Sequence, residues 1–358
     1  MFANNQQLKK KESEKLNFSE YNLNEEELDF LIICIEQSTT LTKLNLCSNN
    51  LGEEFSKKLA ESLKKNKTLK ILDLDKNKIH LKSFSPALSV NETLQELILS
   101  KNGLESKDIK KLSKHLQKNS SVVKLDLHKN KFGNKGLIYL SQMLKMNQTI
   151  EELDVGENEF SKLTGITELS NALKKNSSIT KLSLYRNKIK KDAAQILAEG
   201  LKENDSIQVL SMWGNKIKCK GLISITESFA EKSESEIRLH TLMLQKNKIS
   251  NEGIKFFCKK MKHNTSLRVL NLYKNDIEFS GMKSLSKFLS FNSSLTKLDI
   301  GENNIDNRAI KLLSDSLKNN STLLCLNIYK NGIDNEGFFF IYFLFFYIYF
   351  FFGFLFFK

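Results

Sequence analysis

The sequence predicts an α/β solenoid in which short parallel strands alternate with helices. An eleven-residue pattern, L-x-x-L-x-L-x-x-N-x-I, is clearest at residues 295–305 and recurs along the chain with asparagine at the same place. Successive asparagines are 25 to 32 residues apart, and most steps are 28 residues. A fixed period of this length indicates structural repeats that stack side by side. The repeated asparagines are Asn49, Asn77, Asn102, Asn130, Asn158, Asn187, Asn215, Asn247, Asn275, Asn303 and Asn331.

Each repeat has two halves with different apolar periods. Apolar residues alternate around Leu182-Ser183-Leu184, which is typical of a short strand. Residues 193–201 carry apolar side chains at helical spacing. This combination is the leucine-rich-repeat signature. We therefore expect a right-handed leucine-rich-repeat solenoid, a horseshoe with parallel strands on its concave side and helices on its convex side.

The segments follow in order along the chain. Residues 1–12 are predicted to be a polar disordered tail, and 13–40 a degenerate capping repeat in which Tyr21 stands 28 residues before Asn49. Asn24 is a good helix N-cap, so a helix is expected at 25–37. Residues 41–337 form eleven leucine-rich repeats of about 28 residues. The last segment, 338–357, is apolar and rich in Phe.

Two columns of asparagine have predicted structural roles. The repeated Asn follows the strand, where its amide can bond backbone groups that the strands leave unpaired. A second Asn begins an N-x-[S/T] sequence at the turn from helix to strand in nine repeats. Because Asn tolerates the left-handed conformation that ends helices, we interpret the second column as turn chemistry rather than glycosylation sites. Its members are Asn66, Asn91, Asn119, Asn147, Asn176, Asn204, Asn264, Asn292 and Asn320.

The chain resembles the ribonuclease-inhibitor class of leucine-rich repeats in three features. These are the 28-residue step, the helix sequence Leu59-Ala60-Glu61-Ser62-Leu63 and the turn Ile305-Asp306-Asn307. That class includes the repeat arrays of NOD-like receptors, tropomodulin-like proteins and the Ran GTPase-activating protein. The resemblance covers residues 16–337. It implies a fold, and for function it implies either a protein-binding scaffold or, as an alternative, a regulator of a small GTPase. No catalytic residue is carried over, because no motif marks one.

Composition limits the function classes. The formal net charge is +14, and lysines in the last turns of helices account for part of it. Five scattered cysteines without a C-x-x-C pattern indicate a reducing, intracellular compartment rather than disulfides or zinc. The amino terminus lacks an apolar signal segment. The five histidines share no ligand spacing, so we expect no metal and no cofactor. His128 and Asp126 are a weak catalytic pair without a nucleophile, so we expect no enzyme.

The strand face is the predicted binding surface. The residue two positions before each repeated Asn faces the concave side, and from Tyr185 onward four of the six residues in this column are aromatic. Tyr and Trp are frequent hot spots of protein interfaces. The next column, one position before the Asn, is basic in seven of eleven repeats. The predicted protein-binding residues are Tyr185, Trp213, Met243, Tyr273 and Tyr329 with Lys76, Lys101, Lys129, Arg186, Lys246, Lys274 and Lys330.

These residues predict a protein partner with an acidic surface. Acidic residues such as Asp126, Asp154 and Asp299 interrupt the same face, so nucleic acid is disfavoured. We expect a cytoplasmic monomer. Residues 338–357 are long enough to be a transmembrane tail anchor, but translated non-coding sequence and an apolar interaction surface remain alternatives.

Overall fold

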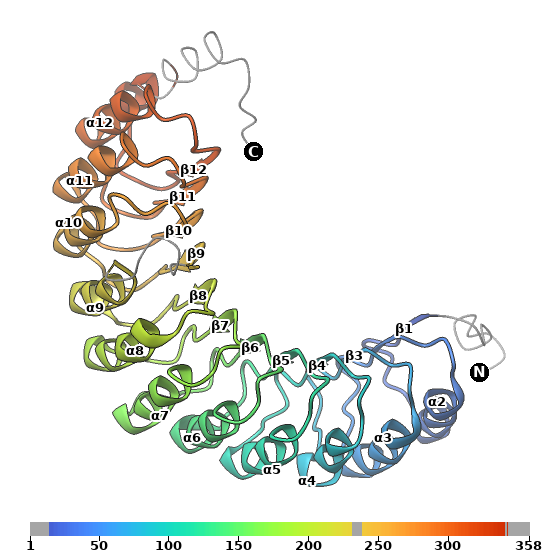
Figure 1. Ribbon diagram of the computed structural model, residues 1–358. Helices are drawn as coiled ribbons and strands as arrows, with labels where there is room; N and C mark the ends of the chain where they lie inside the picture. The colour runs from blue at the N-terminus through green and yellow to red at the C-terminus, as the bar shows by residue number, and fades with distance from the viewer. Residues whose placement is uncertain (1–13, 231–237, 341, 343–358) are drawn as a thin grey trace. The chain divides into compact units, whose positions relative to one another are not determined.

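The computed structural model describes residues 14–230, 238–340 and 342 (Figure 1). Within these residues, twelve parallel strands of three residues alternate with helices, as the repeat pattern predicts. The chain divides into two compact units, Met1–Ser183 and Leu184–Lys358. We describe each unit by itself.

The first unit contains seven parallel strands that pair in chain order. Each strand is in register with the next, for example Leu16 with Leu44 and Leu44 with Leu72. The strands are β1 (Lys15–Asn17), β2 (Lys43–Asn45), β3 (Ile71–Asp73), β4 (Glu96–Ile98), β5 (Lys124–Asp126), β6 (Glu152–Asp154) and β7 (Lys181–Ser183). The helices between them are α2 (Glu25–Gln37), α3 (Glu53–Lys65), α4 (Leu81–Phe84), the 3-10 helix η2 (Ser85–Ser89), α5 (Ser106–Leu116), α6 (Gly133–Leu144) and α7 (Leu163–Leu173).

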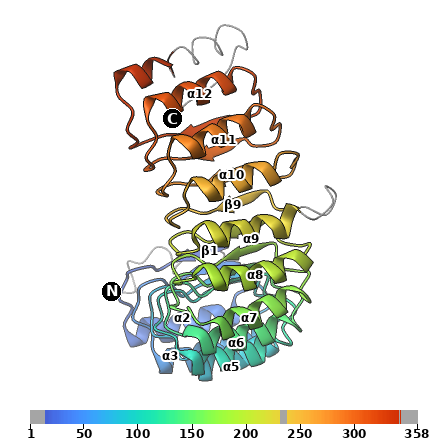
Figure 2. The ribbon, with the colours of Figure 1, turned by 90° about the vertical axis from the view of Figure 1, so that its left-hand side faces the viewer.

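The second unit repeats this arrangement. Its strands are β8 (Val209–Ser211), β9 (Thr241–Met243), β10 (Val269–Asn271), β11 (Lys297–Asp299) and β12 (Cys325–Asn327), and neighbours pair in parallel. Its helices are α8 (Lys191–Glu203), α9 (Lys218–Ala230), α10 (Asn251–Lys260), α11 (Phe279–Leu289) and α12 (Asn307–Leu317). Figure 2 shows α9 to α12 stacked one on another along one side of this unit.

The core of each unit lies between its strands and its helices. The middle residue of an interior strand points inward, and Leu44, Leu125 and Leu298 are fully buried in this way. The residues on either side of it face away from the core and are half-buried or exposed. In Figure 1 the strands line one side of each unit and the helices the other. The strand face is therefore free to present side chains to a partner.

The repeated asparagines bond in the way the sequence predicts. The amide nitrogen of Asn77 donates to the carbonyls of Leu46 (2.9 Å) and Leu74 (3.2 Å), one in each of two neighbouring repeats. Its amide oxygen accepts from the backbone N–H groups of Asn49 and Leu51, each at 3.0 Å. The same bonds recur around Asn130, Asn275 and Asn303. The column thus connects successive strand ends.

The left-handed conformation predicted for the second asparagine column is wrong. Asn66 has extended backbone with φ −65° and ψ 131°, and the column's members are absent from the positive-φ residues of the described chain. These side chains are instead held by hydrogen bonds. The amide nitrogen of Asn66 donates to Ile35 O at 2.7 Å, and its oxygen accepts from Leu69 N at 2.7 Å. Asn66 is buried, so its position suits turn closure and not glycosylation.

Two other segments follow from local sequence. The helix α2 has the predicted bounds, and Asn24 forms a capping box with Glu27. The repeat with the 25-residue step replaces a full helix by the four-residue α4 and by η2. Pro86 stands at the start of η2, where its missing N–H costs no helical hydrogen bond.

The apolar segment 338–357 lies largely outside the described residues. Of its members, Phe338, Phe339, Phe340 and Tyr342 are described; they are helical, and Phe338, Phe339 and Tyr342 are exposed. No helix within the described ranges has the length and apolar character needed to cross a membrane.

Candidate functional site

The local backbone of each repeat fixes how the strand-face side chains are presented. The residue just before the repeated Asn has positive φ in repeat after repeat, for example Lys76 (54°), Lys129 (53°) and Lys246 (53°). This left-handed residue turns the chain at the strand end, which lets the following Asn side chain enter the core side. The basic column that the sequence predicts as a binding rim is therefore also the column of left-handed turns.

The most developed cluster on the strand face is in the second unit. The rings of Tyr185 and Trp213 stack, with centroids 5.0 Å apart and planes 7° from parallel. The stack follows from backbone pairing, since Leu184 N–H donates to Ser211 O and Arg186 N–H donates to Trp213 O, each at 2.8 Å. Both rings are half-buried. Their contact brings together two of the predicted residues.

Two cations complete this cluster. The Arg186 guanidinium lies 5.4 Å from the centroid of the Trp213 ring, and the Lys246 ammonium lies 6.0 Å from it. Gly214 allows the approach of Arg186, because a Cβ at Gly214 would lie 2.6 Å from Arg186 Cγ. Gly214 also has a φ of 68°. We call Tyr185, Arg186, Trp213 and Lys246 the aromatic-cation patch.

Met243 lies on β9, beside this patch. It is in register with Ser211, which precedes Trp213 by two residues. The Gln245 amide nitrogen is 3.7 Å from the Met243 sulfur, and Gly214 N–H donates to Gln245 O at 2.7 Å. Met243 is therefore one strand from the stacked rings, as its place in the repeat predicts.

Tyr273, Lys274, Tyr329 and Lys330 form a second cluster around an acid that the sequence analysis does not include, Glu302. The Tyr273 hydroxyl donates to Glu302, and Lys274 pairs with the same carboxylate. The Lys330 ammonium lies 3.8 Å from Glu302 and 5.3 Å from the Tyr329 ring centroid. Glu302 stands in the basic column itself, so it compensates one of the two positive charges of Lys274 and Lys330.

The pKa values in this second cluster follow from the same contacts. The hydrogen bond to Glu302 raises the pKa of Tyr273 to about 12. Hydrogen bonds from Lys274 and Tyr273 lower the pKa of Glu302 to about 2. Glu302 is thus a carboxylate, and Tyr273 a neutral phenol, throughout the neutral range.

Lys76, Lys101 and Lys129 belong to the first unit and are described apart from the aromatic-cation patch. Lys76 and Lys129 are exposed. The Lys101 ammonium is 3.1 Å and 3.2 Å from the two carboxylate oxygens of Asp75, so its charge is neutralised within the chain. The basic column is therefore not a uniform rim.

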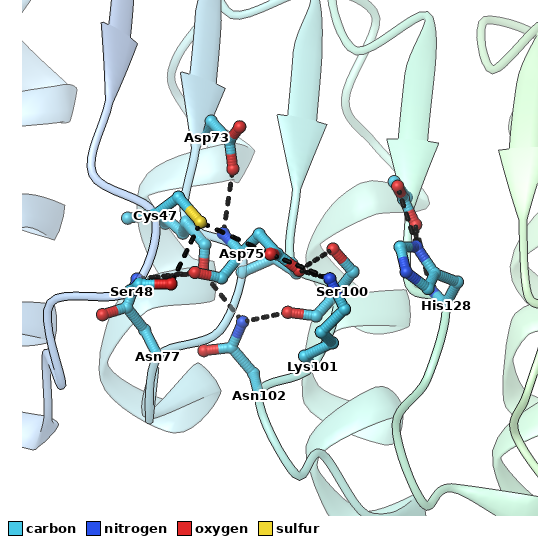
Figure 3. Close-up of polar contacts among 12 residues, drawn as sticks. Cys47, Ser48, Asp73, Asp75, Asn77, Ser100, Lys101, Asn102 and His128 are labelled. Atoms are coloured by element: carbon cyan, nitrogen blue, oxygen red, sulfur yellow. Dashed lines mark hydrogen bonds and ion pairs between the residues drawn. The ribbon is translucent and has the colours of Figure 1, made fainter. Parts of the chain in front are cut away.

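Asp75 is the centre of a polar network in the first unit (Figure 3). Its carboxylate accepts hydrogen bonds from the Ser100 hydroxyl, from Lys101 and from the Cys47 thiol, whose sulfur is 3.4 Å away. Burial alone would raise the pKa of Asp75. The three hydrogen bonds together lower it by more, so the pKa of Asp75 is below its usual value. Burial is the main reason that the pKa of Cys47 is raised, which makes this thiol a poor nucleophile.

A third cluster consists of Asp126, His128 and Asp154. The first two are the pair that the sequence offers as a weak catalytic candidate. His128 Nδ1 is 2.9 Å from Asp126 Oδ1, and one ligand atom from each of the three residues lies within 4.8 Å of the others. The hydrogen bond with Asp126 raises the pKa of His128. Burial raises the pKa of Asp154 to about 6.

Spacing among the histidines alone could not reveal this cluster. The informative signal is the repeat: Asp126 and Asp154 occupy the same position of successive repeats, 28 residues apart, with His128 two residues after the first.

Comparisons with known proteins agree with the fold. Six segments match a family model described as Leucine Rich repeat, residues 65–82, 90–113, 118–141, 263–286, 291–314 and 319–340. No curated protein matches the chain significantly. The crystal structure of an internalin (inlF) from Listeria monocytogenes str. 4b F2365 has a TM-score of 0.52 and 22% identity, and the match covers 92% of this chain and 84% of that chain.

A chain from the crystal structure of the Rad7 and Elc1 complex in yeast has a TM-score of 0.55 and 17% identity, with 89% of this chain and 74% of that chain covered. Identities this low show the fold alone. Together with the matched segments, they show that the chain is built of leucine-rich repeats.

Proposed function

We propose that this leucine-rich-repeat solenoid is a non-catalytic scaffold that binds an acidic protein segment at the aromatic-cation patch. The observation that carries the proposal is the stack of Tyr185 on Trp213 with Arg186 and Lys246 beside the indole. Large aromatic side chains and arginine are the groups that most often dominate protein interfaces. Here they stand on a sheet face whose backbone is fixed by strand pairing.

The patch favours a partner that carries both an apolar and an acidic group. The half-buried rings can bury an apolar side chain at little cost in conformational entropy, because their stacking already restricts them. Arg186 and Lys246 are both exposed. Both cations lie at the Trp213 ring, so a carboxylate that binds there could accept charge-assisted hydrogen bonds from them. The net charge of +14 would speed the approach of an acidic partner.

The finer sequence-based predictions belong to the same proposal. Assignment to the ribonuclease-inhibitor class is supported by the period of about 28 residues with a helix in nearly every repeat. A cytoplasmic location is supported by the five cysteines, all of which are free thiols. A monomer is the expected state, and light scattering on the purified chain would measure it.

The test is affinity purification of the full chain with quantitative mass spectrometry. The variant replaces both rings, Tyr185→Ala with Trp213→Ala, and the matched control is Phe291→Ala. Phe291 follows α11 on the helix side of the unit, is exposed, and has a cation, Lys262, 5.3 Å from its ring centroid. The control thus removes an exposed aromatic beside a lysine without touching the strand face.

We expect an acidic protein to be depleted at least about tenfold with the double variant and to be retained with Phe291→Ala, in line with a loss of about 1.4 kcal/mol or more. Nuclease treatment before capture should change nothing. Circular dichroism and thermal unfolding check that all variants fold. Equal recovery of that protein with the double variant, or loss of the signal after nuclease treatment, would contradict the proposal.

A further inference from the structure

The first unit places two carboxylates side by side, and in the described residues neither is paired with a lysine or an arginine. Asp126 on β5 is in register with Asp154 on β6, and adjacent strands are about 4.8 Å apart. Both side chains are half-buried, with Asp126 21% exposed, so water screens their repulsion only partly. Like charges directly opposite one another in a sheet are destabilising.

The neighbouring row of the same strands shows how this sheet balances acids elsewhere. Two residues before Asp126 and Asp154, the row reads Glu96, Lys124, Glu152 and Lys181 on successive strands. Lys124 pairs with Glu96 at 3.3 Å, and Lys181 pairs with Glu152. Among the contacts of the described residues, no lysine or arginine pairs with Asp126 or Asp154.

The group that meets these two acids is an imidazole. His128 Nδ1 lies 2.9 Å from Asp126 Oδ1 and 3.2 Å from Oδ2. The equivalent position on the next strand is Gly156, whose carbonyl accepts from Lys129 N–H at 2.8 Å and which has no side chain to cover the cluster. His128 is labelled in Figure 3, where dashed lines mark its contacts with the carboxylate of Asp126.

We propose that Asp126, His128 and Asp154 bind one divalent transition-metal ion, with Zn²⁺ as the best match. Their three ligand atoms lie within 4.8 Å of one another, so modest side-chain rotation brings all three to the 2.0–2.2 Å bond lengths of zinc. One nitrogen and two oxygen ligands suit Zn²⁺ better than Mg²⁺ or Ca²⁺, which prefer oxygen alone. Metal ligands bind in their unprotonated forms, so metal binding would displace any proton that these residues carry.

The backbone orients the two carboxylates for this role. Asp126 Oδ1 accepts from His128 N–H and Asp154 Oδ1 accepts from Gly156 N–H, each at 2.9 Å. Hydrogen bonds to ligand carboxylates fix their orientation. Three protein ligands leave the fourth zinc position open toward the strand face, where water or a partner's carboxylate or imidazole can bind. The site would thus add a metal-dependent contact on this face of the first unit, distinct from the aromatic-cation patch of the second.

The test measures binding of Zn²⁺ to the full chain after metal removal with a chelator, by competition with a chromophoric zinc indicator. The absorption of Co²⁺ in the visible range reports the coordination geometry. The variants are Asp154→Asn and His128→Gln, which keep size and remove one ligand each. The control is Asp299→Asn, because Asp299 accepts from Gly301 N–H at 3.1 Å in the same way, in the equivalent position of another repeat.

We expect one Zn²⁺ per chain, a loss of affinity of at least tenfold in each ligand variant, and no change in Asp299→Asn. Wild type should bind Mg²⁺ and Ca²⁺ at least a hundredfold more weakly than Zn²⁺. Circular dichroism verifies that each variant folds. Equal Zn²⁺ affinity in wild type and in both ligand variants would overturn the proposal, and so would a preference for Ca²⁺.

Discussion

At the scale of the single residue, the repeated asparagine matters because its one short side chain bonds backbone groups of neighbouring repeats. Asn275 donates to the carbonyls of Leu244 and Leu272 at 3.0 and 2.9 Å. Its oxygen accepts from the N–H groups of Asn247 and Ile249 at 3.0 and 3.1 Å. A short side chain with two donors and an oxygen that accepts twice is what this turn requires. Asp lacks the donors, and Gln is one methylene too long.

Replacing Asn275 by leucine should strongly destabilise the second unit. The change leaves four backbone groups without their partners at a site that is 6% exposed. We expect a loss of at least about 2 kcal/mol, because buried polar groups without hydrogen bonds are costly. The urea midpoint measures it. The control is Asn304→Leu, at an exposed position where only the backbone N–H is bonded, to Ile277 O at 2.9 Å. Equal midpoints in the two variants would contradict this account.

At the scale of the element, the strand end combines a left-handed residue with the asparagine that follows it. Lys129 has a φ of 53°, and its N–H donates to Gly156 O at 2.8 Å. Unbranched lysine tolerates this conformation with a modest penalty, whereas a β-branched residue is strained there. Backbone geometry therefore partly determines which residues occupy the basic column. A lysine in that column is weaker evidence for partner binding than an aromatic residue in the column two positions before the Asn.

Substitutions at Lys129 separate charge from backbone strain. Lys129→Val should lower stability by about 1–2 kcal/mol, while Lys129→Gly should not, because glycine adopts positive φ freely. The control Lys131→Val changes an exposed lysine that is not among the positive-φ residues. Thermal unfolding monitored by circular dichroism measures the three variants. A valine at 129 as stable as a valine at 131 would mean that the turn has no conformational requirement.

Sequence patterns predicted the elements well where the physics is local. The helix at 25–37 and its Asn24 cap depend on neighbouring residues, and the period sets the strand register. Only the backbone conformation of the second asparagine column was predicted wrongly, because an Asn at a turn fits two explanations, a left-handed backbone or side-chain hydrogen bonds. Only the coordinates, such as the 2.7 Å contact of Asn66 with Ile35 O, distinguish them.

The candidate site was less predictable because it depends on contacts between repeats. The column of Tyr185 and Trp213 was visible in the sequence, but their stacking and the contact of Arg186 with the indole were not. The sequence shows Glu302 as an acid in the mostly basic column, but its contacts with Tyr273 and Lys274 could not be predicted from it. From the sequence, Asp154 was recognised only as an acid on a basic face. Its proximity to His128 follows from the register between β5 and β6.

At the scale of the whole molecule, each repeat is stabilised by the repeats beside it, so protection should vary along each unit. Ile300 N–H donates to Asn327 O at 2.9 Å, and Glu302 N–H donates to Tyr329 O at 2.7 Å. The equivalent amides of the following repeat, Ile328 and Lys330, have no such acceptor in the part of the chain that the structure describes. Ile300 is fully buried, whereas Ile328 is half-buried.

Hydrogen exchange of the full chain should reveal this difference. We expect the amides of Ile328 and Lys330 to exchange at least about a hundredfold faster than those of Ile300 and Glu302, because opening of a frayed edge costs far less than opening of an interior strand. Exchange resolved to single residues by NMR or fragmentation mass spectrometry measures it. Equal exchange rates at the two pairs of amides would mean that a further segment or a second molecule pairs with β12. Dilution distinguishes these two explanations, because only pairing between molecules weakens at low concentration.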